Sequence, residues 1–173
     1  HEQPDSIRNT INSVLNENGE YNFGTLNLSK NYLETINKIY IVACGTAMHA
    51  GLAVKNTIEK LCKIVTQVEV ASEFRYKEPL VDENSLCIFV SQSGETADTL
   101  AALNLCKSAN AKTIAITNVV GSSITRLADY SIFTHAGPEI AVASTKAYTA
   151  QVTLLTMLAI HLAEVLQNCN REL

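Results

Sequence analysis

Hydroxyl and amide side chains gather in one short segment of this chain. Residues 91–96 read Ser-Gln-Ser-Gly-Glu-Thr, and a helical pattern begins at Thr96. The hydroxyls and the amide can donate hydrogen bonds, the glycine lets backbone approach a ligand, and the free N–H groups of a helix N-terminus carry partial positive charge. This combination predicts an anion-binding loop that needs no lysine or arginine. An ordinary strand-to-helix turn remains the alternative, because serine and threonine are also preferred N-cap residues.

Two further segments have the composition to contribute to the same site. Residues 44–46, Cys-Gly-Thr, follow an apolar run, and residues 139–147 combine small side chains with two hydroxyls. Lys146 in the second segment would face the positive end of a helix dipole, so it is either solvated or placed for a ligand. The chain contains neither the P-loop pattern G-x-x-x-x-G-K-S/T nor the dinucleotide pattern G-x-G-x-x-G. It also shows no paired acid and base at a recognisable spacing.

The apolar pattern predicts a scaffold that brings these segments together. Short β-rich runs alternate with helical patterns, which is typical of an α/β fold with a five-stranded parallel sheet and helices on both faces. In the flavodoxin-like strand order 2-1-3-4-5, ligands bind where the order reverses, between the first and third strands. The predicted strands are Lys38–Ala43, Gln67–Ala71, Ser85–Val90, Thr113–Thr117 and Ser131–Thr134.

Residues 1–30 are predicted to form an N-terminal helix and linker, and residues 31–173 the α/β domain. The last helix is apolar on all sides, so it must be buried on all sides. We infer that another subunit or domain covers it; a helix in the centre of the chain's own core is the alternative. The predicted helices are Pro4–Leu15, Met48–Cys62, Thr96–Ala109, Ser122–Leu127 and Ser144–Val165, with a short turn at Glu73–Tyr76.

Composition excludes several classes of protein. The chain has 173 residues, 13 Lys plus Arg against 17 Asp plus Glu, and a net charge of −4, which argues against a nucleic-acid or anionic-membrane partner. The most apolar stretch, Val152–Leu166, is too short and too polar to span a bilayer. Five cysteines without a C-x-x-C pair indicate neither a metal site nor a disulfide framework, so we expect a cytoplasmic protein without metal or cofactor.

The motifs together resemble a known family. Residues 44–46, the loop 91–96 with Ala-Asp-Thr after it, and the run Val-Ala-Ser-Thr-Lys-Ala at 142–147 are similar to the first sugar isomerase (SIS) domain of the glutamine:fructose-6-phosphate aminotransferases. The similarity includes Glu-Gln-Pro at 2–4 and Ala-Ser-Glu-Phe-Arg-Tyr at 71–76, and thus covers essentially the whole chain. The loop alone would indicate only the SIS superfamily, whereas the combination is specific to these enzymes.

The resemblance implies a site for a phosphosugar. It implies that the loop holds the phosphate, that residues 44–46 line the other side of the pocket, and that residues 142–144 contact the sugar end. The family commonly has serine where this chain has Ala47, so one hydrogen bond to the phosphate would be lost here. The implied substrate-binding residues are Cys44, Gly45, Thr46, Ser91, Gln92, Ser93, Thr96, Val142, Ala143 and Ser144.

The resemblance also implies an activity that other domains complete. Such enzymes convert fructose 6-phosphate and glutamine to glucosamine 6-phosphate, using a glutaminase domain and two SIS domains. This chain resembles the first SIS domain alone, so the expected partners are the glutaminase, the second SIS domain and a second copy in a homodimer, and no catalytic residue is expected here. A stand-alone phosphosugar-sensing regulatory module and an assembly domain that binds nothing tightly are the alternatives.

Overall fold

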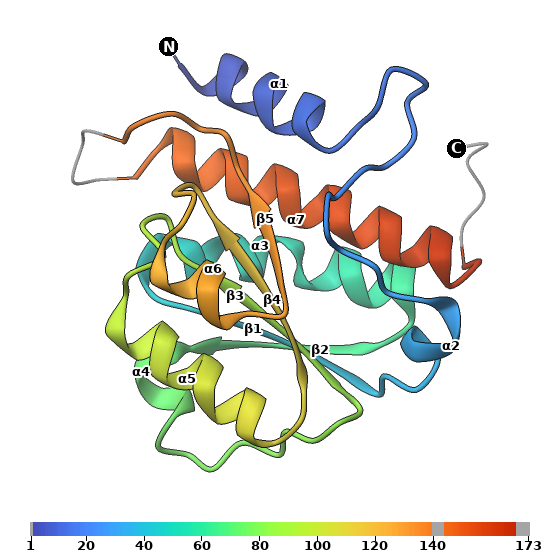
Figure 1. Ribbon diagram of the computed structural model, residues 1–173, viewed down its shortest axis with the longest axis vertical. Coiled ribbons are helices and arrows are strands. Elements are labelled where there is room, and N and C mark those ends of the chain that lie inside the picture. Colours follow the sequence, from blue (N-terminus) through green and yellow to red (C-terminus); the bar gives the residue numbers. More distant parts are fainter. Residues whose placement is uncertain (1, 140–143, 169–173) are drawn as a thin grey trace.

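A five-stranded sheet, parallel throughout, forms the centre of the protein in a computed structural model that describes residues 2–139 and 144–168 (Figure 1). Its order is β2-β1-β3-β4-β5, which confirms the predicted fold class and strand order. The strands are β1 (Lys38–Ala43), β2 (Val65–Val70), β3 (Ser85–Val90), β4 (Lys112–Thr117) and β5 (Tyr130–Phe133). The bounds of β1 and β3 are those predicted, and the other strands differ by one or two residues.

Helices cover both faces of the sheet, as the apolar runs predict. Ile39 and Ile41 of β1 belong to the core beneath α3 and α7, whereas Tyr40 and Val42 belong to the core beneath α4, α5 and α6. The helices are α1 (Gln3–Ser13), α2 (Lys30–Leu33), α3 (Gly45–Cys62), α4 (Ala71–Phe74), α5 (Ala97–Ser108), α6 (Ser123–Leu127) and α7 (Lys146–Val165).

The two largest differences from the predicted helices are the start of α3 and the presence of α2; the other helices begin within two residues of their predicted starts. α3 begins at Gly45, three residues before the predicted start at Met48, because Gly45 has φ +58° and turns the chain from strand into helix at once. The short α2 was not predicted, and it begins where the Ser29 hydroxyl accepts a hydrogen bond from the backbone N–H of Tyr32 at 3.2 Å. Both starts depend on a local turn that leaves no periodic apolar signal.

The last helix is covered in part by the chain itself. α7 packs against α3 on one side and α1 on the other, and the rings of Tyr21 and Phe23 lie against His161 at 5.5 and 5.0 Å (Figure 1). By length and composition α7 could span a membrane, contrary to the sequence argument, but a helix packed inside a fold has the same composition. The chain's own packing thus accounts for part of the apolar pattern, and the inference that another subunit or domain covers the rest stays a prediction.

Polar contacts fasten α1 to the start of α7. Lys146 Nζ donates to Glu2 Oε2 at 2.7 Å, and the Ser6 hydroxyl donates to the carbonyl of Lys146 at 3.3 Å. The hydrogen bond and the charge of Lys146 lower the pKa of Glu2. The sequence left open whether Lys146 is solvated or contacts a ligand. In the structure Lys146 binds the N-terminal helix. The division of the chain at residue 30 stays a prediction. In the structure α1 packs directly on α7 of the α/β domain.

The close packing of α3 on the sheet makes a prediction about Gly51. A Cβ at this position would lie 2.8 Å from Ile41 Cγ2 and 3.1 Å from Val68 Cγ1. Gly51→Ala should therefore lower the free energy of unfolding by about 1 to 2 kcal/mol in urea titrations, because overpacking outweighs the gain in helix propensity of about 1 kcal/mol. Ala53→Gly on the exposed face of α3 measures the propensity effect alone. A more stable Gly51→Ala variant would contradict this packing.

Candidate functional site

Parallel pairing of β1 with β3 places the two predicted loops side by side. Ala43 at the end of β1 pairs with Val90 at the end of β3, so Cys44 and Ser91 leave the same edge of the sheet as neighbours. The chain then turns to α3 on one face and to α5 on the other. Two helix N-termini thus meet at the point where the strand order reverses, which is the usual ligand position in such sheets.

The loop at 91–96 is organised by its own hydroxyls. Ser91 Oγ accepts a hydrogen bond from the backbone N–H of Gly94 at 3.1 Å and lies 3.1 Å from Thr96 Oγ1. Ser93 Oγ accepts from the backbone N–H of Glu95 at 3.2 Å. Thr96 occupies the N-cap position of α5, but its side chain does not cap the helix. The first N–H groups of α5 therefore have no capping side chain.

Hydrogen bonds to the end of β4 and to the residue after it hold the loop in place. The carbonyl of Gln92 accepts from the backbone N–H of Asn118 at 3.1 Å and from Thr117 Oγ1 at 3.2 Å, and the backbone N–H of Ser91 donates to the carbonyl of Ile116 at 3.0 Å. The loop is thus joined to β4, which lies on the other side of β3 from β1. These bonds keep the donors of the loop in place before any ligand arrives.

Gly94 is required by both conformation and space. Its φ is +69°, and a Cβ there would lie 2.3 Å from Ser122 Oγ and 2.9 Å from Ile124 Cγ2. The carbonyl of Gly94 accepts from the backbone N–H of Ile124 at 3.0 Å. The loop therefore passes over the start of α6 at a distance that only glycine allows.

Glu95 points away from the site. Its Oε1 accepts from the backbone N–H of Ser123 at 2.7 Å, so the carboxylate caps α6. The hydrogen bonds from Ser123 and the charge of Arg126 lower the pKa of Glu95. The one acidic side chain of the loop is thus kept ionised at a helix N-terminus and does not face an anion.

A cavity of about 270 Å³ lies between these segments. It is close to the smallest volume usual for a ligand site, roughly 300 Å³. Seven of the ten predicted site residues line it. Gly45 lies between two of them in the first turn of α3, and Val142 and Ala143 lie outside the described residues. The lining residues are Cys44, Thr46, Ala47, Val90, Ser91, Gln92, Ser93, Thr96, Glu139, Ser144 and Gln151.

The lining has no basic side chain among the residues that the structure describes. Its one charged group is Glu139, whose Oε2 accepts from the backbone N–H groups of Thr145 at 3.3 Å and Ala147 at 3.1 Å. This carboxylate is held by the N-terminus of α7, whose dipole offsets part of its charge. The remaining electrostatic attraction for an anion comes from the N-termini of α3 and α5.

The hydroxyls of the loop retain donors for a ligand. Each hydroxyl has one hydrogen and two acceptor lone pairs. Ser93 uses its oxygen as an acceptor, so its hydrogen is free to donate. Ser91 and Thr96 share one hydrogen bond, which leaves one of their two hydrogens. Together with the N-terminus of α5, these donors can bind the oxygens of a phosphate or a similar anion.

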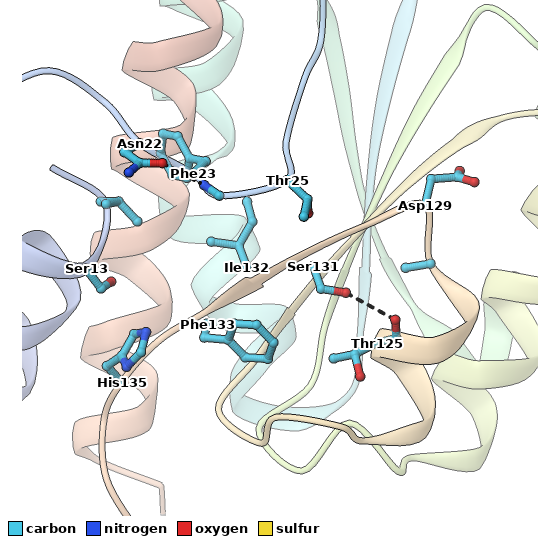
Figure 2. Close-up of a pocket in the computed structure, with 13 residues that line it drawn as sticks. Ser13, Asn22, Phe23, Thr25, Thr125, Asp129, Ser131, Ile132, Phe133 and His135 are labelled. Carbon is cyan, nitrogen blue, oxygen red and sulfur yellow. Dashed lines mark hydrogen bonds between the residues drawn. The ribbon is translucent and has the colours of Figure 1, made fainter. Parts of the chain in front are cut away.

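A larger hollow of about 460 Å³ lies elsewhere, beside the edge strand β5. Figure 2 shows its walls, which include Phe23 from the segment after α1 and Ile132 and Phe133 from β5. Two of its polar groups are engaged: Ser131 Oγ donates to the carbonyl of Thr125 at 3.4 Å, and Asp129 Oδ2 accepts from the backbone N–H of Thr113 at 2.9 Å. The smaller cavity is the better candidate site, because it lies where the strand order reverses and the N-termini of α3 and α5 meet there.

Sequence reasoning gave no role to two of the lining residues. Glu139 stood at the edge of a segment already noted for its hydroxyls, but nothing in its spacing indicates that it caps α7. Gln151 is a polar residue in a largely apolar helix, and that contrast was the only available signal. Its position in the cavity depends on how α7 packs.

Comparison with known proteins agrees with this geometry. Residues 32–161 match the family described as the SIS domain. The isomerizing glutamine–fructose-6-phosphate aminotransferases of Clostridium tetani and Clostridium acetobutylicum are 54% and 52% identical, over 99% and 95% of this chain. The chain spans only 28% and 27% of the length of these two relatives.

A solved structure shows the same arrangement of elements. The C-terminal domain of glucosamine-fructose-6-phosphate aminotransferase from Francisella tularensis superposes with a TM-score of 0.90 and 41% sequence identity. The match covers 98% of this chain and 48% of that one. Both the sequence and the fold are therefore similar to one part of a larger protein.

The two constraints on Gly94 can be separated by experiment. Gly94→Ala should lower the free energy of unfolding by about 2 to 4 kcal/mol, because it combines a left-handed conformation with overpacking against Ser122. Gly121 has a similar φ of +74° but open space around it, so Gly121→Ala should lose only about 1 to 2 kcal/mol. Urea denaturation measures both. Equal losses would show that the contact with Ser122 has no effect.

Proposed function

Because this chain belongs to the SIS domain family, we propose that it is the first isomerase subdomain of a glutamine:fructose-6-phosphate aminotransferase. In this role it binds fructose 6-phosphate, which the complete enzyme converts with glutamine to glucosamine 6-phosphate and glutamate. Identities of 54% and 52% to two such enzymes support this function over a stand-alone regulatory module. The observation that carries the proposal is the convergence of two helix N-termini and the hydroxyls of residues 91–96 on one cavity.

The phosphate of the sugar binds at the loop. The hydrogens left by Ser93 and by the pair Ser91 and Thr96 donate to its oxygens, and the N-termini of α3 and α5 stabilise its charge. This arrangement explains how a chain with a net charge of −4 attracts an anion. With the phosphate fixed, the carbon chain of the sugar extends along the cavity toward Ser144, and its reacting carbons are held for groups that transfer protons.

The acid and base for proton transfer come from outside this chain. Glu139 is the single carboxylate lining the cavity within the described ranges, and its Oε2 is committed to the N-terminus of α7. Neither His49 nor any other histidine of those ranges lines it. The relatives are more than three times as long as this chain. The second SIS domain is therefore the proposed source of the acid and base, and the glutaminase acts on glutamine.

The cellular setting is part of the proposal. Cys44, Cys87 and Cys106 are free thiols, which suits the reducing cytoplasm. Contact with Cys106 and burial raise the pKa of Cys87, so this thiol stays protonated and serves as core packing. A homodimer, which the resemblance to the aminotransferases implies, is proposed as well.

The phosphate-binding role makes a prediction about ligand selection. In NMR titrations, fructose 6-phosphate and glucose 6-phosphate should shift the amide signals of residues 91–96, whereas fructose should not. The double variant Ser93→Ala, Thr96→Ala should weaken binding of both phosphosugars by at least about tenfold, because hydrogen bonds to a charged group contribute about 1.5 to 3 kcal/mol each. Unchanged affinity in this variant would favour the assembly domain that binds nothing tightly.

The proposed division of labour predicts that this chain alone is inactive. Incubation of the purified 173-residue chain with fructose 6-phosphate should give no glucose 6-phosphate and, with glutamine or ammonia, no glucosamine 6-phosphate. Adding the second SIS domain in trans tests where the missing groups reside. Turnover by the chain alone, above that of the Ser93→Ala, Thr96→Ala variant, would disprove the proposed source of the acid and base.

A further inference from the structure

Gln151 is a buried residue whose side-chain oxygen has no hydrogen-bond partner. It lies in the second turn of α7, between Ala150 and the apolar residues Leu154 and Leu155, and only 2% of its surface is exposed. Its Oε1 atom is buried and accepts no hydrogen bond. A buried polar atom left in this state costs about 1 to 3 kcal/mol, so an apolar residue here would make the unliganded protein more stable.

The position of Gln151 offers a reason for this cost. Four side-chain oxygens in the described part of the chain are buried and unpartnered: Tyr32 Oη, Thr99 Oγ1, Ser122 Oγ and Gln151 Oε1. Of these residues, Gln151 alone lines the cavity that also contains Ser91, Ser93 and Thr96. A ligand in that cavity can therefore supply the missing partner, which the protein itself does not.

The chemistry of the unpartnered atom restricts the partner. Oε1 is an acceptor, so it needs a donor from the ligand. A phosphate dianion has no hydrogen to donate, and its negative charge would be repelled by the amide oxygen. A sugar hydroxyl can donate. The phosphate already has its own donors in the loop at 91–96, so the amide is suited to the part of the ligand that carries hydroxyls.

We propose that Gln151 is a substrate-binding residue whose side-chain amide accepts a hydrogen bond from a hydroxyl of the bound phosphosugar. This inference rests on the proposed function, because it takes a sugar phosphate as the ligand. It adds a specificity element on α7 to the phosphate-binding elements on α3 and α5. The loop selects for phosphate, and Gln151 selects for a hydroxylated carbon chain attached to it.

The test separates the two parts of the ligand. Gln151→Met removes the amide and keeps a side chain of similar length. In the intact protein that carries this chain, isothermal titration calorimetry should show fructose 6-phosphate binding roughly three- to tenfold more weakly, because one hydrogen bond and its buried partner are lost. Inorganic phosphate should bind with unchanged affinity. The unliganded variant should unfold at the same or a higher temperature than the wild type.

Tyr32→Phe is the matched control. It also removes a buried, unpartnered oxygen, but Tyr32 does not line the cavity, so the affinities for both ligands should stay at the wild-type values. Gln151→Asn, which keeps the amide but withdraws it by one methylene, provides a second variant if Gln151→Met fails to fold. It should weaken binding of fructose 6-phosphate and leave that of phosphate unchanged.

Failure of this inference can be distinguished from failure of the proposed function. Equal affinities for fructose 6-phosphate in the wild type and in both Gln151 variants, or equal losses for the sugar phosphate and for inorganic phosphate, would show that Gln151 does not contact the sugar. If the wild-type protein binds fructose 6-phosphate no more tightly than inorganic phosphate, the proposed function fails as well.

Discussion

In-register pairing between β1 and β3 is the constraint on which the rest of the site depends. Because Ala43 lies opposite Val90, the chain leaves both strands at one edge of the sheet, and the crossovers that follow run to opposite faces. The N-termini of α3 and α5 consequently meet over that edge. A shift of one residue in this pairing would exchange the side chains of β1 between its two buried faces and move Ile39 and Ile41 out of the core beneath α3 and α7, so packing on both faces holds the geometry of the site.

The proposed recognition of an anion without basic side chains depends on this arrangement. Backbone N–H groups and hydroxyls are fixed before binding, since Ser91, Ser93 and Gln92 are joined to the loop and to β4 by hydrogen bonds. The acidic groups nearby are tied to other helices: Glu95 caps α6 and Glu139 caps α7. Each carboxylate is thus stabilised where a helix dipole is positive, and neither is free to oppose a phosphate at the loop.

α7 connects the site to the outer layer of the fold. Its N-terminus holds Glu139, its second turn places Gln151 in the cavity, and its first residue, Lys146, binds Glu2 of the N-terminal segment. The outer side of the helix is covered by α1 and by the rings of Tyr21 and Phe23. The N-terminal segment and the cavity therefore share one element, although they lie on different sides of it.

The fold class, the bounds of β1 and β3, and the loop at 91–96 were predictable from the sequence, because continuous apolar runs and a cluster of hydroxyls are local signals. It did not indicate the start of α3 at Gly45, which depends on one backbone angle, or the coverage of α7 by α1, which depends on segments far apart in the chain. The roles of Lys146 and Gln151 were likewise decided only by the tertiary structure. Both residues lie on the same helix, but packing directs one amine to Glu2 and one amide into the cavity, and no sequence spacing specifies such directions.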